Sequence, residues 1–234
     1  YTTLFRSGRV TYLTTLLLSV TDSEYYPRLS ASCKDLDEAH RLMNSQALAM
    51  CMITAPLVAL FMICAPIVVY VILEYEKFQM SIPLAQMAAI GLLFKSVYQP
   101  IAYLALARSD SRIYILQETV CYILLVICVV LGFRLGGIIG VGVSLAIWEL
   151  LYLIQILIIA KLRYGLVMSR HLVRNFLVQG ILLALVASGL MAGNGAGLAV
   201  GVTACVLSFV FSLRFFSTHT TFLSGLKSVF VRKP

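Results

Sequence analysis

Residues 42–73 read LMNSQALAMCMITAPLVALFMICAPIVVYVIL, and these 32 residues contain no charged side chain. About 20 predominantly apolar residues are enough for an α-helix to cross the hydrocarbon core of a bilayer, so this stretch predicts a transmembrane helix. Pro56 and Pro66 predict kinks in it, because each proline removes a helix hydrogen bond. The whole chain is 61% hydrophobic and 12% charged, whereas a soluble domain carries about 25% charged residues. We therefore expect an all-α fold, a polytopic integral membrane helical bundle.

The apolar runs and the short polar gaps between them predict six full transmembrane helices and one truncated helix. The uncharged run 175–213 has 39 residues and would be about 58 Å long as one helix, so it must fold back. The stretch GLMAGNGAG at 189–197 predicts that turn. The truncated helix is expected at 8–22, and the full spans are expected at 47–73, 82–107, 113–133, 137–160, 175–191 and 198–213.

The first seven residues, YTTLFRS, read as the in-frame translation of a common sequencing-adapter end. We expect residues 1–7 to be an assembly artefact and the protein to begin upstream, so they are left out of the fold prediction.

Lysine and arginine residues are distributed unequally between the two sets of alternate gaps. Thirteen lie in residues 23–46, 108–112, 161–174 and 214–234, and two, Lys77 and Arg134, lie on the other side, with Arg9 near it. Because loops rich in Lys and Arg stay on the inner side, the segment 23–46, the basic tail 214–234 and the C-terminus are predicted to be cytoplasmic. The net charge of +8 reports topology here and does not indicate nucleic-acid binding, which needs a basic face.

The polar segment that precedes the first full span contains a helix-start signal. Asp35-Leu-Asp-Glu38 has the form of a capping box, with an acidic N-cap and a glutamate three residues later. It predicts a helix that runs through Leu42 into the span without a break. Pro27 and the residues just after it are expected to mark the end of the preceding span.

Several motifs in order resemble bacterial oligosaccharide flippases of the O-antigen translocase type, a branch of the multidrug/oligosaccharidyl-lipid/polysaccharide exporter superfamily. The motifs that show the resemblance are DSEYYPRLSASCKDLDEAHRLMNSQ (22–46), ILEYEKF (72–78), GLLFKSVYQPIAYLALARSDSRIYILQET (91–119) and LGGIIGVGVSLAI (135–147). No single motif is diagnostic; their order and spacing carry the resemblance, which covers about residues 20–165.

The resemblance implies an inner-membrane protein of 12 or 14 spans in two bundles, of which this chain would be most of the C-terminal one. The cargo would be an undecaprenyl-diphosphate-linked oligosaccharide, flipped for O-antigen, lipopolysaccharide or other polysaccharide biosynthesis. Membrane lipids and glycan assembly enzymes would be its partners, with no nucleic acid.

Three charged residues fall inside predicted spans, and such residues are functional candidates because a charge in the membrane is costly. Lys95 and Glu149 each lie twelve residues from the cytoplasmic end of their span, about 18 Å deep, while Glu118 lies about 8 Å deep. Lys95 and Glu149 are therefore expected to face the cavity or each other. Lys95 would hold a diphosphate or a sugar carboxylate, and Glu149 would respond to protons or sodium. A buried ion pair without cargo contact is the alternative.

Two further residues complete the candidate substrate-binding set. Gln99 precedes Pro100, which frees a backbone carbonyl that could line a cavity, and Arg28 is placed to contact lipid phosphate. Gly136, Gly140 and Ser144 are spaced by four and predict close helix packing without cargo contact.

Enzyme motifs and metal-ligand spacings are absent from the sequence, and His40, His171 and His219 are scattered. We expect no catalytic residue, metal or cofactor, and coupling to H⁺ or Na⁺ stays open. A cation-coupled multidrug exporter of the same superfamily is one alternative. A membrane-embedded glycan polymerase or acyltransferase is another, disfavoured by the short extracytoplasmic gaps.

Overall fold

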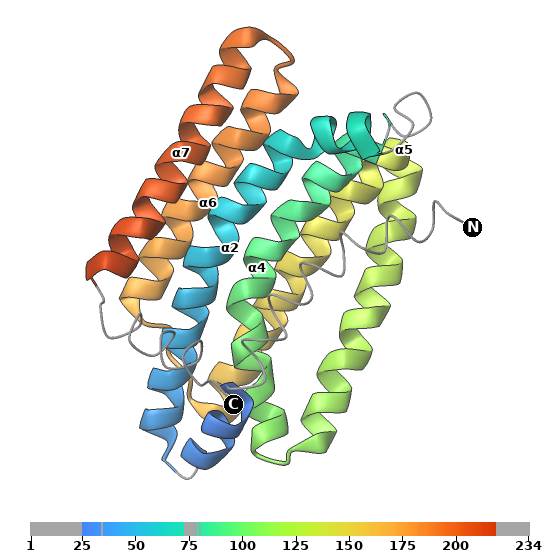
Figure 1. The fold of residues 1–234 in the computed structure, drawn as a ribbon. Helices are drawn as coiled ribbons and strands as arrows, with labels where there is room; N and C mark the ends of the chain where they lie inside the picture. The colour runs from blue at the N-terminus through green and yellow to red at the C-terminus, as the bar shows by residue number, and fades with distance from the viewer. Residues whose placement is uncertain (1–24, 34, 73–78, 80, 219–234) are drawn as a thin grey trace.

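A computed structural model describes residues 25–33, 35–72, 79 and 81–218, and no β-strand occurs among them. The main elements are α2 (Leu36–Ile72), α4 (Ser81–Ala107), α5 (Ser111–Tyr164), α6 (Arg170–Met191) and α7 (Gly195–Thr218) (Figure 1). In the described part of the chain these five helices are long and apolar enough to cross a membrane. The prediction of an all-α membrane bundle is confirmed. The predictions for residues 1–7 and 8–22 and for most of the basic tail lie outside the described residues.

Helix α5 is a hairpin of two antiparallel arms, here called the first arm (residues 111–135) and the second arm (residues 138–164). The helix geometry breaks at Gly136 and at Gly137, whose φ of 57° belongs to the region that glycine tolerates best. Gly132 and Gly140 face each other across the hairpin so closely that a Cβ on either would strike the other's carbonyl oxygen. The turn therefore lies where the expected spans 113–133 and 137–160 meet, and α5 provides two crossings.

The expected ridge of small residues is present only in part. Gly140 and Ser144 pack against Gly132 of the first arm, as close helix packing requires. At Gly136 a Cβ would have no neighbouring atom within 4 Å, because this residue lies in the turn itself. Its role is to allow the chain to reverse, and the prediction that it belongs to the ridge is wrong.

Helices α6 and α7 form a second hairpin at the glycine-rich turn expected from the sequence. The Asn194 side chain accepts a hydrogen bond of 2.7 Å from the backbone N–H of Gly197, which caps the start of α7. Gly189 and Gly197 approach backbone to backbone, with no room for a side chain. The long uncharged run is thus divided into two helices of 22 and 24 residues.

The start of α2 follows the predicted capping signal. The Asp35 carboxylate accepts hydrogen bonds from the backbone N–H groups of Asp37 (3.0 Å) and Glu38 (3.4 Å). In a complete capping box the Glu38 side chain would accept a hydrogen bond from the Asp35 N–H. Here the Asp35 N–H donates to the Ser32 carbonyl instead. Residues 36–46 are helical and continuous with the span, so α2 begins eleven residues before the expected boundary at 47.

A short helical segment over residues 25–32 packs on the bundle. Tyr25 and Leu29 are buried while Tyr26 and Arg28 are exposed, which is the i, i+4 pattern of a helix with one face against a neighbour. The Tyr25 hydroxyl donates to the carbonyl oxygen of Pro100 on α4 at 2.9 Å. The helix continues five residues past Pro27, further than the end that this proline predicted.

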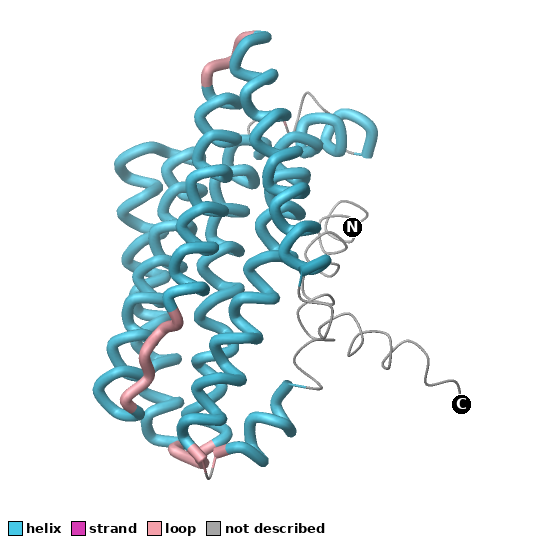
Figure 2. Tube along the Cα trace, turned by 90° about the vertical axis from the view of Figure 1, so that its left-hand side faces the viewer, coloured by secondary structure: helices cyan, strands magenta, loops and turns pink. Residues whose placement is uncertain are grey.

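Helix α2 lies between the α4–α5 part and the α6–α7 hairpin and contacts both. The long helices run side by side along a common direction (Figure 2). Their outer faces carry large apolar side chains that are about half exposed or more, such as Ile115, Val126 and Ile181. In water such continuous apolar faces would be unfavourable, whereas lipid chains solvate them.

Buried polar side chains hold the helices together inside the bundle. Pro66 cannot donate a helix hydrogen bond to the carbonyl of Met62, and the Gln86 side chain of α4 fills that role at 2.7 Å. On the other side of α2, Gln179 is fully buried and bonds to Ser208 (2.6 Å) and Ser212 (2.9 Å) of α7. These bonds fix the register of neighbouring helices where apolar contacts alone would allow sliding.

Basic residues gather at one end of the bundle, called the basic end, which comprises the start of α2, the turn between α4 and α5, and the helix ends on either side of the loop 165–169 (Figure 1). Arg134 lies at the opposite end, beside the α5 turn. At the basic end the Asn44 side chain donates to the Val167 carbonyl (3.2 Å) and accepts from the Ser169 N–H (2.8 Å), which fastens the loop to α2. The lysines and arginines of the basic end that the structure describes are Arg28, Arg41, Arg108, Arg112, Lys161, Arg163, Arg170, Arg174 and Arg214.

Candidate functional site

The charged residues expected at mid-membrane lie on facing helices, α4 and the second arm of α5. Gly91 and Lys95 are one helical turn apart on α4, and a Cβ on Gly91 would lie 2.8 Å from the Glu149 side chain. Glu149 is therefore seated in the space that the missing side chain of Gly91 leaves. The glycine one turn before Lys95 thus has a physical role, because a larger residue at position 91 would displace the carboxylate.

Each of the two acids in the site is held by a tyrosine from a different helix. Tyr98 of α4 donates a 2.6 Å hydrogen bond to Glu149, which is only 9% exposed. Tyr152 of the second arm donates a 2.5 Å hydrogen bond to Glu118 of the first arm. The two tyrosine rings meet edge to face, with centroids 4.6 Å apart. The four side chains form one continuous array across the three helices.

A pocket of about 260 Å³ opens beside this array. Its polar lining consists of Lys95, Gln99 and Glu118, so three of the five residues expected to bind substrate surround one space. Glu118 lines the pocket with Lys95 although its expected depth differs. The rest of the lining is mainly aromatic: Tyr98, Tyr103, Tyr114, Tyr122, Trp148 and Tyr152.

Lys95 is the one positively charged residue among those that line the pocket. No hydrogen bond or ion pair joins its amine to another residue in the described ranges. It is near enough to Glu149 for the two charges to interact, yet Glu149 takes its hydrogen bond from Tyr98. Of the two arrangements expected from the sequence, the alternative of a direct Lys95–Glu149 ion pair is not formed in this structure, and the Glu149 carboxylate accepts from Tyr98 instead.

Glu149 and Arg28 lie apart from the pocket lining. Glu149 sits behind Tyr98, one hydrogen bond away from the space that Tyr98 lines. Arg28 is exposed on the short segment 25–32, and it lines neither of the two pockets. Its neighbour Tyr26 contacts the pocket residue Tyr103, with ring centroids 6.2 Å apart.

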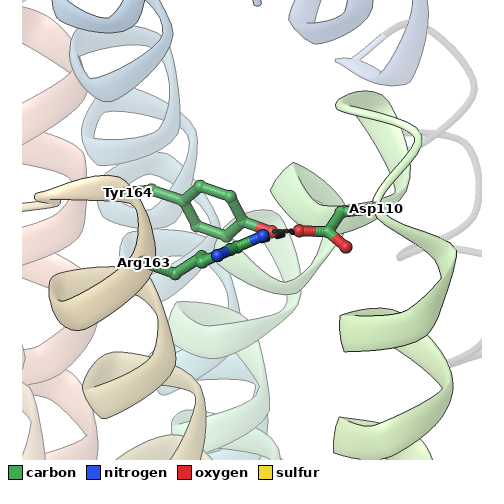
Figure 3. A network of polar contacts seen from close by, with 3 residues as sticks. All are labelled: Asp110, Arg163 and Tyr164. Atoms are coloured by element: carbon green, nitrogen blue, oxygen red, sulfur yellow. Dashed lines mark hydrogen bonds and ion pairs between the residues drawn. The ribbon is translucent and has the colours of Figure 1, made fainter.

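A larger, open hollow of about 390 Å³ lies at the basic end and contains none of the residues expected from the sequence. There Arg163 pairs with Asp110 at 3.4 Å, and the Tyr164 hydroxyl donates to the same carboxylate oxygen at 3.3 Å (Figure 3). Arg108 lies over the Tyr164 ring, 5.5 Å from its centroid. The Arg163 side chain is 61% exposed, so this network ties the ends of the α5 hairpin with little gain in stability.

The thiol nearest to this end of the bundle has little nucleophilic character. Partial burial raises the pKa of Cys33, and the positive charge of Arg108 acts in the opposite direction and more weakly. Less thiolate is therefore present at neutral pH than for an exposed cysteine.

Four aromatic residues of the pocket were not expected from the sequence: Tyr114, Tyr122, Trp148 and Tyr152. A signal for two of them was present, because Tyr114 and Tyr122 flank Glu118 at i−4 and i+4 and share its helix face. Trp148 and Tyr152 could be found only through the α5 hairpin, which brings Trp148 to the Cys121 carbonyl at 2.9 Å.

Models of protein families, curated proteins and solved structures were compared with this chain, and none matches it. The class of protein that fold and pocket define is a multi-pass helical membrane protein with a polar site among its helices.

Proposed function

We propose that this chain is the C-terminal half of a flippase that moves an undecaprenyl-diphosphate-linked oligosaccharide across the bacterial inner membrane by alternating access. The observation that carries the proposal is the pocket between α4 and α5, where Lys95, Gln99 and Glu118 line an aromatic space within the membrane-spanning part. Burying charged side chains at this depth of the membrane costs free energy, and such residues mark substrate or ion pathways. Their position between helices fits transporters, whose substrate sites lie near the bilayer midplane.

The chemistry of the pocket suits a cargo that is both sugar and phosphate. Lys95 offers a positive charge to a diphosphate or an acidic sugar, and Gln99 and Glu118 offer groups that bind hydroxyls. The motifs shared with oligosaccharide flippases support the same cargo, and the basic end is assigned to the cytoplasm by its excess of arginine and lysine. The function is transport, without a catalytic step on the glycan.

A cation-coupled drug exporter is the second candidate, because Glu118 among tyrosines is also an arrangement that binds organic cations. Lys95 opposes it, since a cation bound in the pocket would meet the positive charge of this lysine in a medium of low dielectric constant.

The deciding experiment places the full-length protein, with both bundles, in liposomes. A lipid-linked oligosaccharide is supplied in one leaflet, and its transfer is followed with a glycosidase that cannot cross the bilayer. We expect transfer well above that of protein-free liposomes, and slower transfer for Lys95→Met than for Lys161→Met, a change at an exposed lysine. Efflux of ethidium without any glycan transfer would favour the exporter and overturn the proposal.

A further inference from the structure

We infer that the pocket between α4 and the two arms of α5 is a subsite for one acidic sugar ring, with Lys95 as the partner of the acid group. This inference rests on the proposed function and states which part of the cargo the described site holds. It follows from the size, the walls and the charge of the pocket, taken in turn.

The size of the pocket fits one ring. Pockets for drug-sized ligands measure about 300–1,000 Å³, and this one measures about 260 Å³. This volume accommodates a single pyranose, and a complete oligosaccharide repeat would extend beyond the pocket. The lipid diphosphate and the remaining sugars must then lie elsewhere in the passage.

The walls of the pocket suit the faces of a sugar ring. A pyranose presents C–H groups of slightly positive charge on its faces, and aromatic rings carry negative charge on theirs. Tyr98, Trp148 and Tyr152 come from two different helices and border the space together. The Trp148 N–H already donates to the Cys121 carbonyl, which fixes the orientation of the indole. A preformed aromatic wall binds a ring without first paying the entropy of ordering its own side chains.

The hydrogen bonds around the pocket distinguish its one cation from its acids and leave Lys95 as the group that an acidic ring would meet. Tyr98 and Tyr152 each donate a hydrogen bond to an acid, Glu149 and Glu118 respectively, so both carboxylates have partners. Among the described residues Lys95 has neither a hydrogen bond nor an ion pair. A carboxylate on the sugar would fill that role, and the second oxygen of Glu118 would accept from sugar hydroxyls.

The chain itself supplies the reporter for a direct test, because Trp148 is its only tryptophan. The protein is placed in vesicles of phosphatidylethanolamine and phosphatidylglycerol, since sugar-based detergents and choline lipids would compete for the pocket. Methyl glucuronide, methyl glucoside and tetramethylammonium are titrated separately while the Trp148 emission is recorded. Helical content, measured by circular dichroism, verifies that each variant is folded.

We expect a saturable change with methyl glucuronide and a dissociation constant on the order of 1 mM, as befits a ligand of one ring. Methyl glucoside should bind about fivefold more weakly, the contribution of one half-buried charge pair. Lys95→Met should remove this preference, while Lys95→Arg and the matched control Lys161→Met should keep it.

Equal affinity for glucuronide and glucoside, stronger binding of tetramethylammonium, or the absence of a saturable response would overturn the inference. A loss of preference in Lys161→Met as large as in Lys95→Met would do the same. The proposed function fails separately: glycan transfer by the full-length protein without a Trp148 response refutes this subsite alone, and a Trp148 response without transfer refutes the flippase.

Discussion

Removing the Tyr98 hydroxyl tests whether the acid array holds α4 against the second arm of α5. In Tyr98→Phe the Glu149 carboxylate loses a 2.6 Å hydrogen bond in a place where it is only 9% exposed. Hydrogen bonds to charged groups contribute about 1.5–3 kcal/mol, and a buried group left without its partner is not compensated by water. The free energy of unfolding should therefore fall by about 1.5–3 kcal/mol.

The companion variant Glu149→Met removes the acid and keeps a side chain of similar length. Because a buried charge is lost together with its hydrogen bond, we expect a change within about 1 kcal/mol in either direction. In the double variant the Tyr98→Phe change should then have little further effect. The coupling free energy of the two changes should be about 1.5–3 kcal/mol.

The unchanged protein, the two single variants and the double variant form a double-mutant cycle. Their free energies of unfolding can be compared by reversible unfolding in mixed detergent and sodium dodecyl sulfate micelles. Tyr122→Phe is the control, because the Tyr122 side chain is 61% exposed and the change should stay within about 0.5 kcal/mol. A coupling below about 0.5 kcal/mol, the level at which independent changes add, would refute the account of the array.

Three further changes test single contacts, the first two by the same unfolding measurement and the third by hydrogen exchange. Gln86→Leu leaves the Met62 carbonyl without a donor and should lower the free energy of unfolding by about 1–3 kcal/mol. Adding Pro66→Ala returns a helix N–H to that carbonyl and should restore most of the loss. No restoration would contradict the role of Gln86 as the substitute donor. Gly91→Ala places a methyl group 2.8 Å from Glu149 and should cost about 1–3 kcal/mol, less when Glu149 is shortened to Ala. Asn44→Leu should speed hydrogen exchange of the backbone in the loop 165–169, and unchanged exchange would argue against the contact.

The spans and turns could be predicted because hydrocarbon imposes a simple rule on composition and length. Residues 175–213 could not form one helix across a bilayer, so their length required a turn, and the glycine-rich stretch 189–197 gave its position. The α5 turn at Gly136 and Gly137 follows from the same rule. The start of α2 at Leu36 lies outside any hydropathy argument, and only the Asp35 capping signal predicted it.

For the candidate site, the sequence predicted only how deep each residue lies in the membrane. Counting residues from a helix end gives the depth of Lys95 and Glu149, but it does not tell which way each side chain turns around its helix. For this reason the sequence left open whether the two side chains face a cavity or each other, and it did not predict the hydrogen bond from Tyr98 to Glu149. The side chain of Glu118 reaches the pocket of Lys95 despite a different depth, since a pocket extends over more than one helical turn.

The orientation of the bundle in the membrane is the claim on which the functional account most depends. Two exposed side chains at opposite ends report it: Val167 in the loop of the basic end and Leu135 at the turn of α5, which are 73% and 87% exposed. Each is changed to cysteine in a chain whose own cysteines are replaced, and spheroplasts are treated with a maleimide that cannot cross the membrane. We predict that Leu135→Cys is labelled in intact spheroplasts and Val167→Cys only after permeabilisation. Labelling of Val167→Cys from outside would contradict the orientation and the flippase assignment with it.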